Sequence, residues 1–497
     1  MAEETKAPEE IKLTNRQARY SEAFQKFICE EWADYDPNLP ELMEAAKYTP
    51  ERRAKLSAIF PGVRLVIPAG GYKVRSNDTD YRFRAHAAFA HLTGLGSIAE
   101  PDAVIVLEPV GSSHEPCLYF HPRVPRTDPE FYSNAQYGEM WVGQRDSLEE
   151  HSARCGIRCA SIEELEADLR KAADSTPMRV LRDADAKITE LVDSIRGRDE
   201  DADAELQIAL SELRMIKDEY EIRQMREACE ATARGFAAVV ANFPTATRVG
   251  RGERVVEGIF GLHARHHGNA VGYETIAASG DHANTLHWID NTGDLKEGDL
   301  LLMDAGVELD SLYTADVTRT LPVTGKFTAP QRKIYEAVLE AQRAGIDAAK
   351  PGVPFADVHK AAITVIAHKM AEWGLLPVSA EEALTPEGGQ HVRWMVHGTS
   401  HHLGIDVHDC AQALRENYRE GLLKEGMIIT VEPGIYFKST DLIVPEELRG
   451  IGVRIEDDIV ITADGCELLS DQLPRDPDDV EAWMAPILAN AEARDTL

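Results

Sequence analysis

The chain has 497 residues, of which 43% are hydrophobic, so it is long enough for two or three domains and apolar enough to bury a large core rather than stay disordered. Its 53 Lys and Arg residues against 85 Asp and Glu residues give a formal net charge of −32. So acidic a surface repels phosphate and anionic lipid, which excludes a nucleic-acid-coating or membrane-surface role.

The apolar runs and the cysteines indicate a cytoplasmic protein. No apolar run approaches the ~20 residues that a membrane-spanning helix needs. The acidic start of the chain, Met1 to Thr5, lacks the apolar region of a secretory signal. The seven cysteines are scattered and odd in number, which is typical of reduced thiols rather than of a disulfide framework.

The first half predicts an extension followed by a small α/β domain. Residues 1–48 are polar and charged, and we interpret them as a solvated or interface-forming N-terminal extension. Over residues 49–205, apolar runs at 63–68 and 103–107 have the length of buried strands and alternate with helical patterns. The charged, glycine-containing stretch 196–203 is the best candidate for a linker.

Residues 206–497 are predicted to form the second, larger domain, which begins with one long helical pattern from Leu206 to about Asn242. Thr328 to Gln331 has the form of a capping box at a helix start. A second helix is expected over about 355–373. The expected strands share one feature, an acidic residue in or directly after an apolar run, and cover residues 300–303, 428–431 and 453–461.

Four acids, Asp304, Asp316, Glu432 and Glu456, lie in or beside these apolar segments. A buried carboxylate costs several kcal/mol unless it is paired or bound to a cation. Any one of them alone could simply cap a turn or pair with an arginine. Turn residues follow Asp304 and Glu432, so two hairpins could direct all four acids at one centre, and the four together favour a shared cation site.

The His-rich run 397–409 offers imidazoles for the same site. Four carboxylates and one imidazole form a hard, mostly oxygen ligand set that suits Mn²⁺ and related ions. The natural arrangement is two ions about 3.5–4 Å apart that share bridging carboxylates. One imidazole suffices as a ligand, so the other histidines are expected to contact substrate or, as for His402, to be structural.

Five segments occur in an order that resembles the "pita-bread" metallopeptidases, most closely the Xaa-Pro aminopeptidases (aminopeptidase P). The segments are Asp304-Ala305-Gly306, Ala315-Asp316-Val317-Thr318-Arg319-Thr320, His397-Gly398-Thr399-Ser400-His401-His402-Leu403-Gly404-Ile405-Asp406-Val407-His408-Asp409, Thr430-Val431-Glu432-Pro433-Gly434-Ile435-Tyr436 and Gly452-Val453-Arg454-Ile455-Glu456-Asp457-Asp458. The first half resembles the N-terminal domain of the same enzymes at residues 75–81 and 139–143. The resemblance implies an α/β (α+β) chain with a small N-terminal α/β domain and a C-terminal pita-bread catalytic domain.

The resemblance also implies a role for each matching residue. The metal ligands would be Asp304, Asp316, His401, Glu432 and Glu456, with Asp316 and Glu456 bridging two divalent ions. Mn²⁺ is favoured, with Zn²⁺ or Co²⁺ as alternatives. The other matches are catalytic or substrate-contacting groups, namely His287, His397, His408, Tyr436 and Arg454, and also Asp78, which reaches a neighbouring subunit's site in tetrameric relatives.

The expected reaction is hydrolysis of the bond between an N-terminal residue and a following proline. A water that bridges two cations loses its proton near neutral pH and becomes the nucleophile. Glu432 would transfer the proton to the leaving prolyl nitrogen, His408 would help stabilise the oxyanion, and His397 would orient the substrate. The proline preference and an assembly into a homodimer or homotetramer are implied by the resemblance alone.

Two alternatives stay open at this point. Prolidase, which cuts only Xaa-Pro dipeptides, has the same ligands, although the motifs at 397–401 and around Glu432 look more like aminopeptidase P. A catalytically inactive peptide-binding module of the same fold is the other alternative, but such modules have lost the ligands that this sequence retains. Creatinase, which uses the fold without metal, is disfavoured for the same reason.

Overall fold

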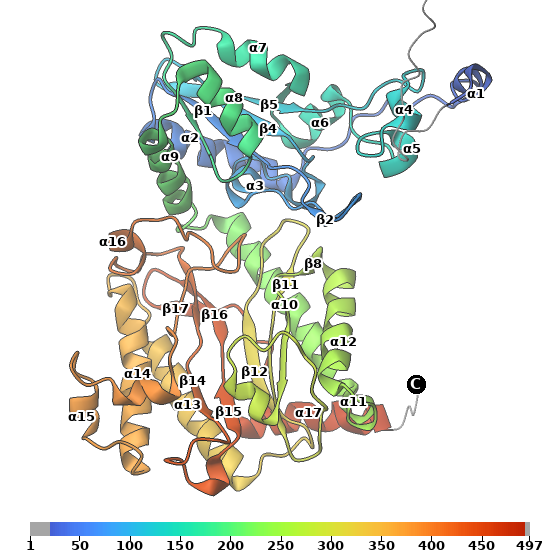
Figure 1. Cartoon of the computed structure of the whole chain (residues 1–497). Helices are drawn as coiled ribbons and strands as arrows, with labels where there is room; N and C mark the ends of the chain where they lie inside the picture. The colour runs from blue at the N-terminus through green and yellow to red at the C-terminus, as the bar shows by residue number, and fades with distance from the viewer. Residues whose placement is uncertain (1–19, 493–497) are drawn as a thin grey trace, which may run out of the picture.

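Two blocks of structure, a smaller N-terminal one and a larger C-terminal one, make up residues 20–492, the part of the chain that this computed structural model describes (Figure 1). Both combine helices with sheets, as the predicted fold class requires. Of the predicted extension 1–48, residues 1–19 lie outside the described residues. The remainder contains helix α1 (Glu22–Phe27) and a 3₁₀ turn (Glu44–Lys47). The predicted domain boundaries stay predictions.

The N-terminal domain is organised around a mixed sheet. Strand β1 (Arg64–Pro68) pairs antiparallel with β4 and parallel with β7, and all five of its residues are buried. In spatial order the strands are β6 (Arg158–Ser161), β5 (Ser113–Phe120), β4 (Val104–Val110), β1 (Arg64–Pro68) and β7 (Met178–Val180). The helices of this domain are α2 (Thr49–Ile59), α3 (Ala87–Thr93), α4 (Glu130–Ser133), α5 (Glu139–Val142), α6 (Leu148–Cys155), α7 (Leu165–Arg170), α8 (Ala186–Arg196) and α9 (Glu200–Leu213). A hairpin of β2 (Val74–Ser76) and β3 (Thr79–Asp80) is exposed.

The connection between the domains differs from the prediction at two points. The linker predicted at 196–203 is mostly helical, because the Asp199 side chain caps α9 from residue 200 onwards. The single helix predicted from Leu206 is two helices, α9 and α10 (Glu219–Ala241). Asp218 and Glu221 form a capping box, which begins a new helix at this point instead of continuing α9.

The C-terminal domain contains two three-stranded sheets and two two-stranded sheets between helices. The strands of the first half of this domain are β8 (Ala270–Val271), β9 (Ile276–Ser279), β10 (Leu300–Ala305), β11 (Val307–Glu308) and β12 (Val317–Pro322). Those of the second half are β13 (Ile428–Val431), β14 (Gly434–Phe437), β15 (Ile451–Arg454), β16 (Asp457–Ile461) and β17 (Cys466–Leu468). The sheet orders are β12-β10-β9 and β13-β16-β17, while β11 pairs with β8 and β14 with β15.

The two acid-bearing hairpins predicted from the sequence are present. Strand β10 pairs antiparallel with β12, so that Asp304 lies opposite Thr318. Strand β13 pairs antiparallel with β16, and Glu432 follows the end of β13. The single strand predicted at 453–461 is wrong, however: the chain leaves β15 and enters β16 around Glu456, because β15 pairs with β14 whereas β16 pairs with β13. Glu456 therefore lies where the chain passes from one sheet to the other.

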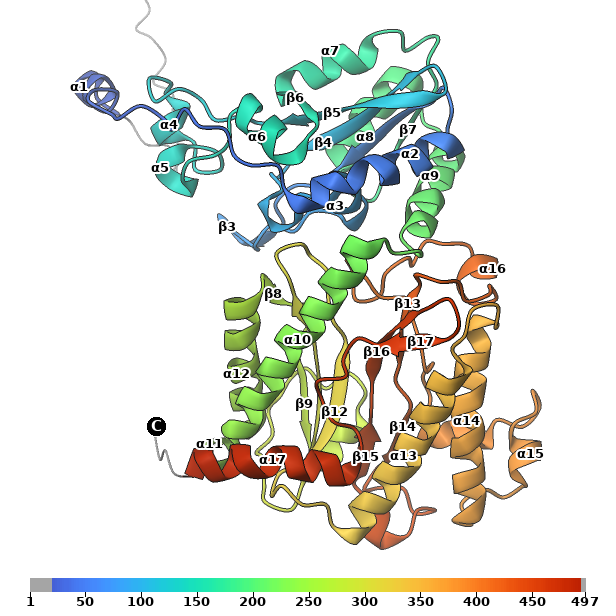
Figure 2. The same cartoon turned by 180° about the vertical axis from the view of Figure 1, so that it is seen from behind.

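Helices cover the outer side of these sheets. Helix α10 packs on α12 (Gly252–His267), and α13 (Ala329–Ala348) packs on α14 (Phe355–Glu372). Figure 2 shows α10, α13 and α17 (Pro477–Glu492) across the back of the domain. Shorter helices are α11 (Phe243–Arg248), α15 (Ala380–Ala383) and α16 (Arg415–Tyr418). Over residues 20–492, no helix combines the length and the apolar character that a membrane crossing requires.

A buried ion network joins the two domains. Arg52 of α2 donates to Asp218 at 2.8 Å and lies 3.8 Å from Glu221, at the start of α10. The Tyr313 hydroxyl also donates to Glu221 at 2.8 Å. Burial by itself would raise the pKa of the Glu221 carboxyl, but His91, Arg52 and the hydrogen bonds around it hold that pKa well below its usual range. Glu221 is therefore held as a charged carboxylate at the domain junction.

We expect Glu221→Gln to lower the free energy of unfolding at pH 7 by about 3 kcal/mol, because it leaves Arg52 buried beside a neutral amide. The folded pKa lies below the unfolded value of about 4.3, so the contribution is complete above that pH and is lost as the pH falls. Urea unfolding at pH 7 and pH 3.5 should show the full difference from wild type at the first pH and a reduced difference at the second, because most of the contribution is lost only as the pH approaches the folded pKa. Glu227→Gln, an exposed change on the same helix, is the control; equal effects of the two variants would contradict the prediction.

Candidate functional site

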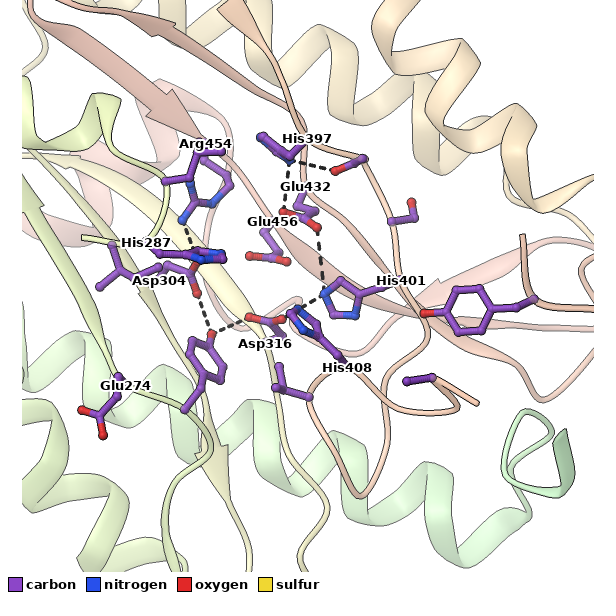
Figure 3. A pocket seen from close by; sticks show the side chains of 18 of the residues that line it. Glu274, His287, Asp304, Asp316, His397, His401, His408, Glu432, Arg454 and Glu456 are labelled. Carbon is purple, nitrogen blue, oxygen red and sulfur yellow. Dashed lines mark hydrogen bonds and ion pairs between the residues drawn. The ribbon is translucent and has the colours of Figure 1, made fainter. Parts of the chain in front are cut away.

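A cavity of about 840 Å³ lies between the two acid-bearing hairpins (Figure 3). Within the described residues, all of its walls belong to the C-terminal domain. The predicted site residues that line it are His287, Asp304, Asp316, His397, His401, His408, Glu432, Arg454 and Glu456. The hairpins thus bring together residues that are up to about a third of the chain apart in sequence.

Three of these side chains lie close enough to share one cation. Asp316 precedes β12, His401 lies in the loop before β13, and Glu456 connects β15 to β16. One donor atom from each of the three lies within 4.8 Å of the others. Asp316 and Glu456 are almost completely buried, with 5% and 1% of their surface exposed, so the cluster is shielded from bulk water.

The orientation of His401 suits a ligand. Its Nδ1 lies 3.1 Å from the backbone carbonyl of His402, to which it can donate a hydrogen bond. Its Nε2 then faces the acids, 3.2 Å from Asp316 and 3.9 Å from Glu432. A metal-binding histidine is commonly held in this way, with one ring nitrogen donating to a carbonyl and the other free for the ion.

Asp304 is held beside Asp316 by hydrogen bonds. The Arg454 guanidinium donates to Asp304 at 2.6 Å, and the Tyr273 hydroxyl lies 2.6 Å from the other oxygen of the same carboxylate. The same hydroxyl also contacts Asp316. Figure 3 shows Arg454, Asp304 and Asp316 among the side chains that line the cavity. The Tyr273 hydroxyl thus holds the Asp304 and Asp316 carboxylates close enough to face one shared cation site.

The remaining acids are fixed by neighbours on both hairpins. The Thr318 hydroxyl donates to Glu456 at 2.6 Å. Arg454 donates to the Tyr436 hydroxyl at 3.1 Å, and that hydroxyl lies 2.8 Å from Nε2 of His397. Nδ1 of His397 lies 3.6 Å from Glu432. The Tyr436 hydroxyl thus links His397 to Arg454, the arginine that holds Asp304.

The pKa values express a surplus of negative charge. Burial and the neighbouring carboxylates raise the pKa of Glu456 well above its usual range, and burial raises that of Glu432 to about 8. Burial also raises the pKa of Asp304, although Arg454 opposes it. Burial alone would lower the pKa of His401, but Asp316 and Glu432 raise it to about 9. Cations are the groups that would relieve this repulsion, so the residues fit a centre for divalent metal ions.

Three other histidines line the cavity without facing the acids in the way that His401 does. The ring of His408 meets that of His401 edge to face, with centroids 4.5 Å apart. Burial lowers the pKa of His397 to about 4, so its ring is neutral at pH 7. His287 points into the cavity near Asp304 and Arg454 (Figure 3). His402 packs instead on the rings of Phe355 and Tyr418, outside the lining.

Asp78 is the predicted site residue that lies elsewhere. It occupies the exposed turn between β2 and β3 and does not line the cavity of its own chain. Its expected contact with a neighbouring subunit's site stays a prediction.

Several residues in or beside the cavity wall escaped the sequence analysis. Thr318 could have been found, because strand alternation places it on the same face as Asp316. Tyr273 carries no comparable signal, since it lies alone before β9 and meets the acids only through the fold. The other unpredicted side chains of the wall include Glu274, Arg415, Tyr418 and Arg419.

Comparison with known proteins identifies the class. The family described as metallopeptidase family M24 matches residues 223–463, and the family described as aminopeptidase P, N-terminal domain, matches residues 49–181. The chain belongs to the M24 metallopeptidases, whose C-terminal pita-bread domain is here preceded by the aminopeptidase P type of N-terminal domain. It is accordingly a metal-dependent hydrolase.

Within that class the chain belongs with the Xaa-Pro aminopeptidases. It is 48% identical over 486 residues to Xaa-Pro aminopeptidase 1 of Streptomyces coelicolor, covering 98% of this chain and 96% of the relative. Xaa-Pro aminopeptidase 3 of Mus musculus is 33% identical over 82% of this chain and 78% of its own length. Aminopeptidase P from E. coli with the inhibitor Pro-Leu superposes with a TM-score of 0.79 at 29% identity, covering 90% of this chain and 99% of that one. The predicted family and fold are confirmed.

We expect Mn²⁺ to raise the melting temperature of metal-stripped protein, because bound cations relieve the repulsion among the buried carboxylates. At 100 times the dissociation constant the gain is about 2.7 kcal/mol. Asp316→Asn should largely remove the Mn²⁺-dependent shift, as followed by differential scanning fluorimetry. Asp441→Asn, which removes the same charge from the surface pair with Arg393, should retain it. A full shift in Asp316→Asn would exclude this cluster as the ion site.

Proposed function

We propose that this chain is a dinuclear metallo-aminopeptidase that releases the first residue from peptides with proline at the second position. The observation that carries the proposal is the cluster of Asp316, His401 and Glu456, flanked by Asp304 and Glu432 in one cavity. Relatives named Xaa-Pro aminopeptidase, at 48% and 49% identity over more than nine-tenths of the chain, support the proline specificity.

The residues that would hold two ions are Asp304, Asp316, His401, Glu432 and Glu456, and Asp316 and Glu456 would be the residues available to both. Four carboxylates and one imidazole form a hard donor set, which supports Mn²⁺. Zn²⁺ and Co²⁺ are the alternatives. A related solved structure is that of a Zn-substituted E. coli aminopeptidase P in complex with product. When bound, the ions supply a water of lowered pKa and polarise the scissile carbonyl.

The protein's own groups then manage the protons and the substrate. Glu432 accepts a proton and returns it to the prolyl nitrogen, which must be protonated to leave as a secondary amine. His408 donates a hydrogen bond to the developing oxyanion from its place beside His401. His397 orients the substrate, supported by its contact with Tyr436.

The same arrangement accounts for the removal of one residue at a time. A free substrate amino group is cationic, and Asp304 at the end of the cavity is its natural partner. Arg454 holds that carboxylate at 2.6 Å, while His287 lies on the same side of the cavity. Asp78 would serve the site of a neighbouring subunit, for which its exposed position at the tip of a hairpin leaves room.

We further propose that the enzyme acts in the cytoplasm as a homodimer or homotetramer. The seven cysteines form no disulfide, which supports a reducing compartment. Exposed apolar side chains on α5, Met140, Trp141 and Val142, support burial of the N-terminal domain edge against another copy. Light scattering after size exclusion measures the assembly directly.

The function is tested by comparing Gly-Pro with a longer Xaa-Pro-Pro peptide, using metal-stripped and Mn²⁺-reconstituted enzyme. We expect Mn²⁺-dependent release of the first residue from the longer peptide and poor cleavage of the dipeptide. Preference for the dipeptide would identify a prolidase. Turnover of neither peptide would support an inactive peptide-binding protein.

We expect His408→Ala to lower kcat by about 10²–10³-fold, the loss typical of one oxyanion donor. The metal content, measured by elemental analysis, should stay at the wild-type level because His408 is not a proposed ligand. His368→Ala on the exposed face of α14 is the control and should leave kcat unchanged. Loss of metal from His408→Ala would show that His408 is a metal ligand and that its assignment as the oxyanion donor is wrong.

A further inference from the structure

His408 lies on a tightly closed loop, residues 404–410. The Asp409 carboxylate accepts from the backbone N–H of Ile405 at 3.1 Å and from that of Cys410 at 2.6 Å. The buried guanidinium of Arg214 donates to the same carboxylate at 2.9 Å. These bonds hold the two ends of the turn together, with His408 beside the carboxylate that closes it.

One flank of the loop rests on the segment that leads to Asp316. The backbone N–H of Thr314 donates to the carbonyl of Gly404 at 2.9 Å, and the Thr314 hydroxyl donates to the carbonyl of Ile405 at 3.3 Å. The loop is therefore fixed relative to the acids on this side. Its other flank faces the N-terminal domain.

There, the side chain of Arg84 reaches the loop from the N-terminal domain. Its guanidinium donates to the Ile405 carbonyl at 2.7 Å and to the Asp406 carboxylate at 2.8 Å. Its Nε–H donates to Glu308 at 2.6 Å, on β11, the strand that follows Asp304. Glu308 is buried, with 5% of its side chain exposed. One guanidinium thus connects the His408 loop to β11, with two hydrogen bonds to the loop and one to Glu308.

This arrangement requires arginine. A guanidinium presents donors in a fixed planar fork, whereas an ammonium is a point charge on a flexible stem. The pair with Asp406 is partly exposed and by itself contributes little to stability. The contact matters because it fixes the position of the loop. A displacement of about 1 Å at a catalytic group can cost up to 10²-fold in rate.

We infer that Arg84 is a positioning residue for the hydrolytic reaction: from the N-terminal domain it clamps Ile405 and Asp406 and thereby sets the place of His408 against His401. The inference rests on the proposed role of His408 in catalysis. It assigns the N-terminal domain a part in the chemistry although that domain contributes no side chain to the cavity wall over residues 20–492.

The test is a double-mutant cycle of Arg84→Ala and His408→Ala on the full-length, Mn²⁺-loaded enzyme with an Xaa-Pro-Pro peptide. Arg84→Ala should lower kcat about 10-fold with unchanged metal content, an effect within the range for misplaced catalytic groups. In the His408→Ala background the same change should lower kcat less than 2-fold, because the group that it positions is gone. Arg84→Lys should recover only part of the rate.

Arg82→Ala is the matched control. Arg82 also reaches from the N-terminal domain to the C-terminal domain, where it donates to Asn269 at 3.2 Å, but it does not touch the loop. It should leave kcat unchanged. Equal losses in the two arginine variants, or an Arg84→Ala loss that persists in full without His408, would overturn the inference.

Two further outcomes are separable. If Arg84→Ala does not fold because Glu308 is left unpaired, Asp406→Ala takes its place in the cycle, since it removes a loop contact and leaves the Arg84–Glu308 pair intact. If His408→Ala itself retains full kcat, the proposed role of His408 fails, and an Arg84→Ala loss in that case would contradict the inference as well. If His408→Ala lowers kcat and the Arg84→Ala loss is additive to it, the inference about Arg84 is wrong while the proposed role of His408 stands.

Discussion

Mutual repulsion among buried carboxylates is the constraint around which the C-terminal domain is organised. Asp304, Asp316, Glu432 and Glu456 face one cavity, and burial together with their neighbours raises the pKa of three of them. The protein itself supplies partial compensation, through Arg454, His401 and the hydroxyl groups around them. Such an arrangement is costly for stability alone and has the charge and donor atoms that suit a centre for divalent cations.

The strand pairing makes this accumulation of charge geometrically stable. Each hairpin fixes one pair of acids, and the joint between the sheets is made by Arg319, whose side chain is 1% exposed. Arg319 donates to the carbonyl of Glu456 at 2.7 Å and to the Asp457 carboxylate at 2.7 Å. A buried guanidinium on β12 thus holds the crossing point where Glu456 enters the cavity, so the two hairpins cannot separate without exposing a paired ion.

The N-terminal domain acts on the site from outside it. Arg52 fixes the junction with α10, and Arg84 reaches the loop that carries His408. Both contacts use arginine, whose several donors can satisfy partners from two domains at once. The outcome is a cavity whose walls come from one domain and whose geometry depends on both.

The amino-acid sequence by itself determined the family, the four acids and the strands that lead to Asp304 and Glu432, because ordered motifs and apolar runs ending in carboxylates are local patterns. It also contained the capping box at Asp218 that divides α9 from α10, a signal that the long helical periodicity concealed. Only the tertiary structure decided that Tyr273 joins Asp304 to Asp316, that the predicted strand 453–461 divides around Glu456, and that Arg84 reaches the His408 loop. These contacts join segments distant in sequence, and a side chain's periodicity or charge does not specify which remote partner the folded sheets will bring beside it.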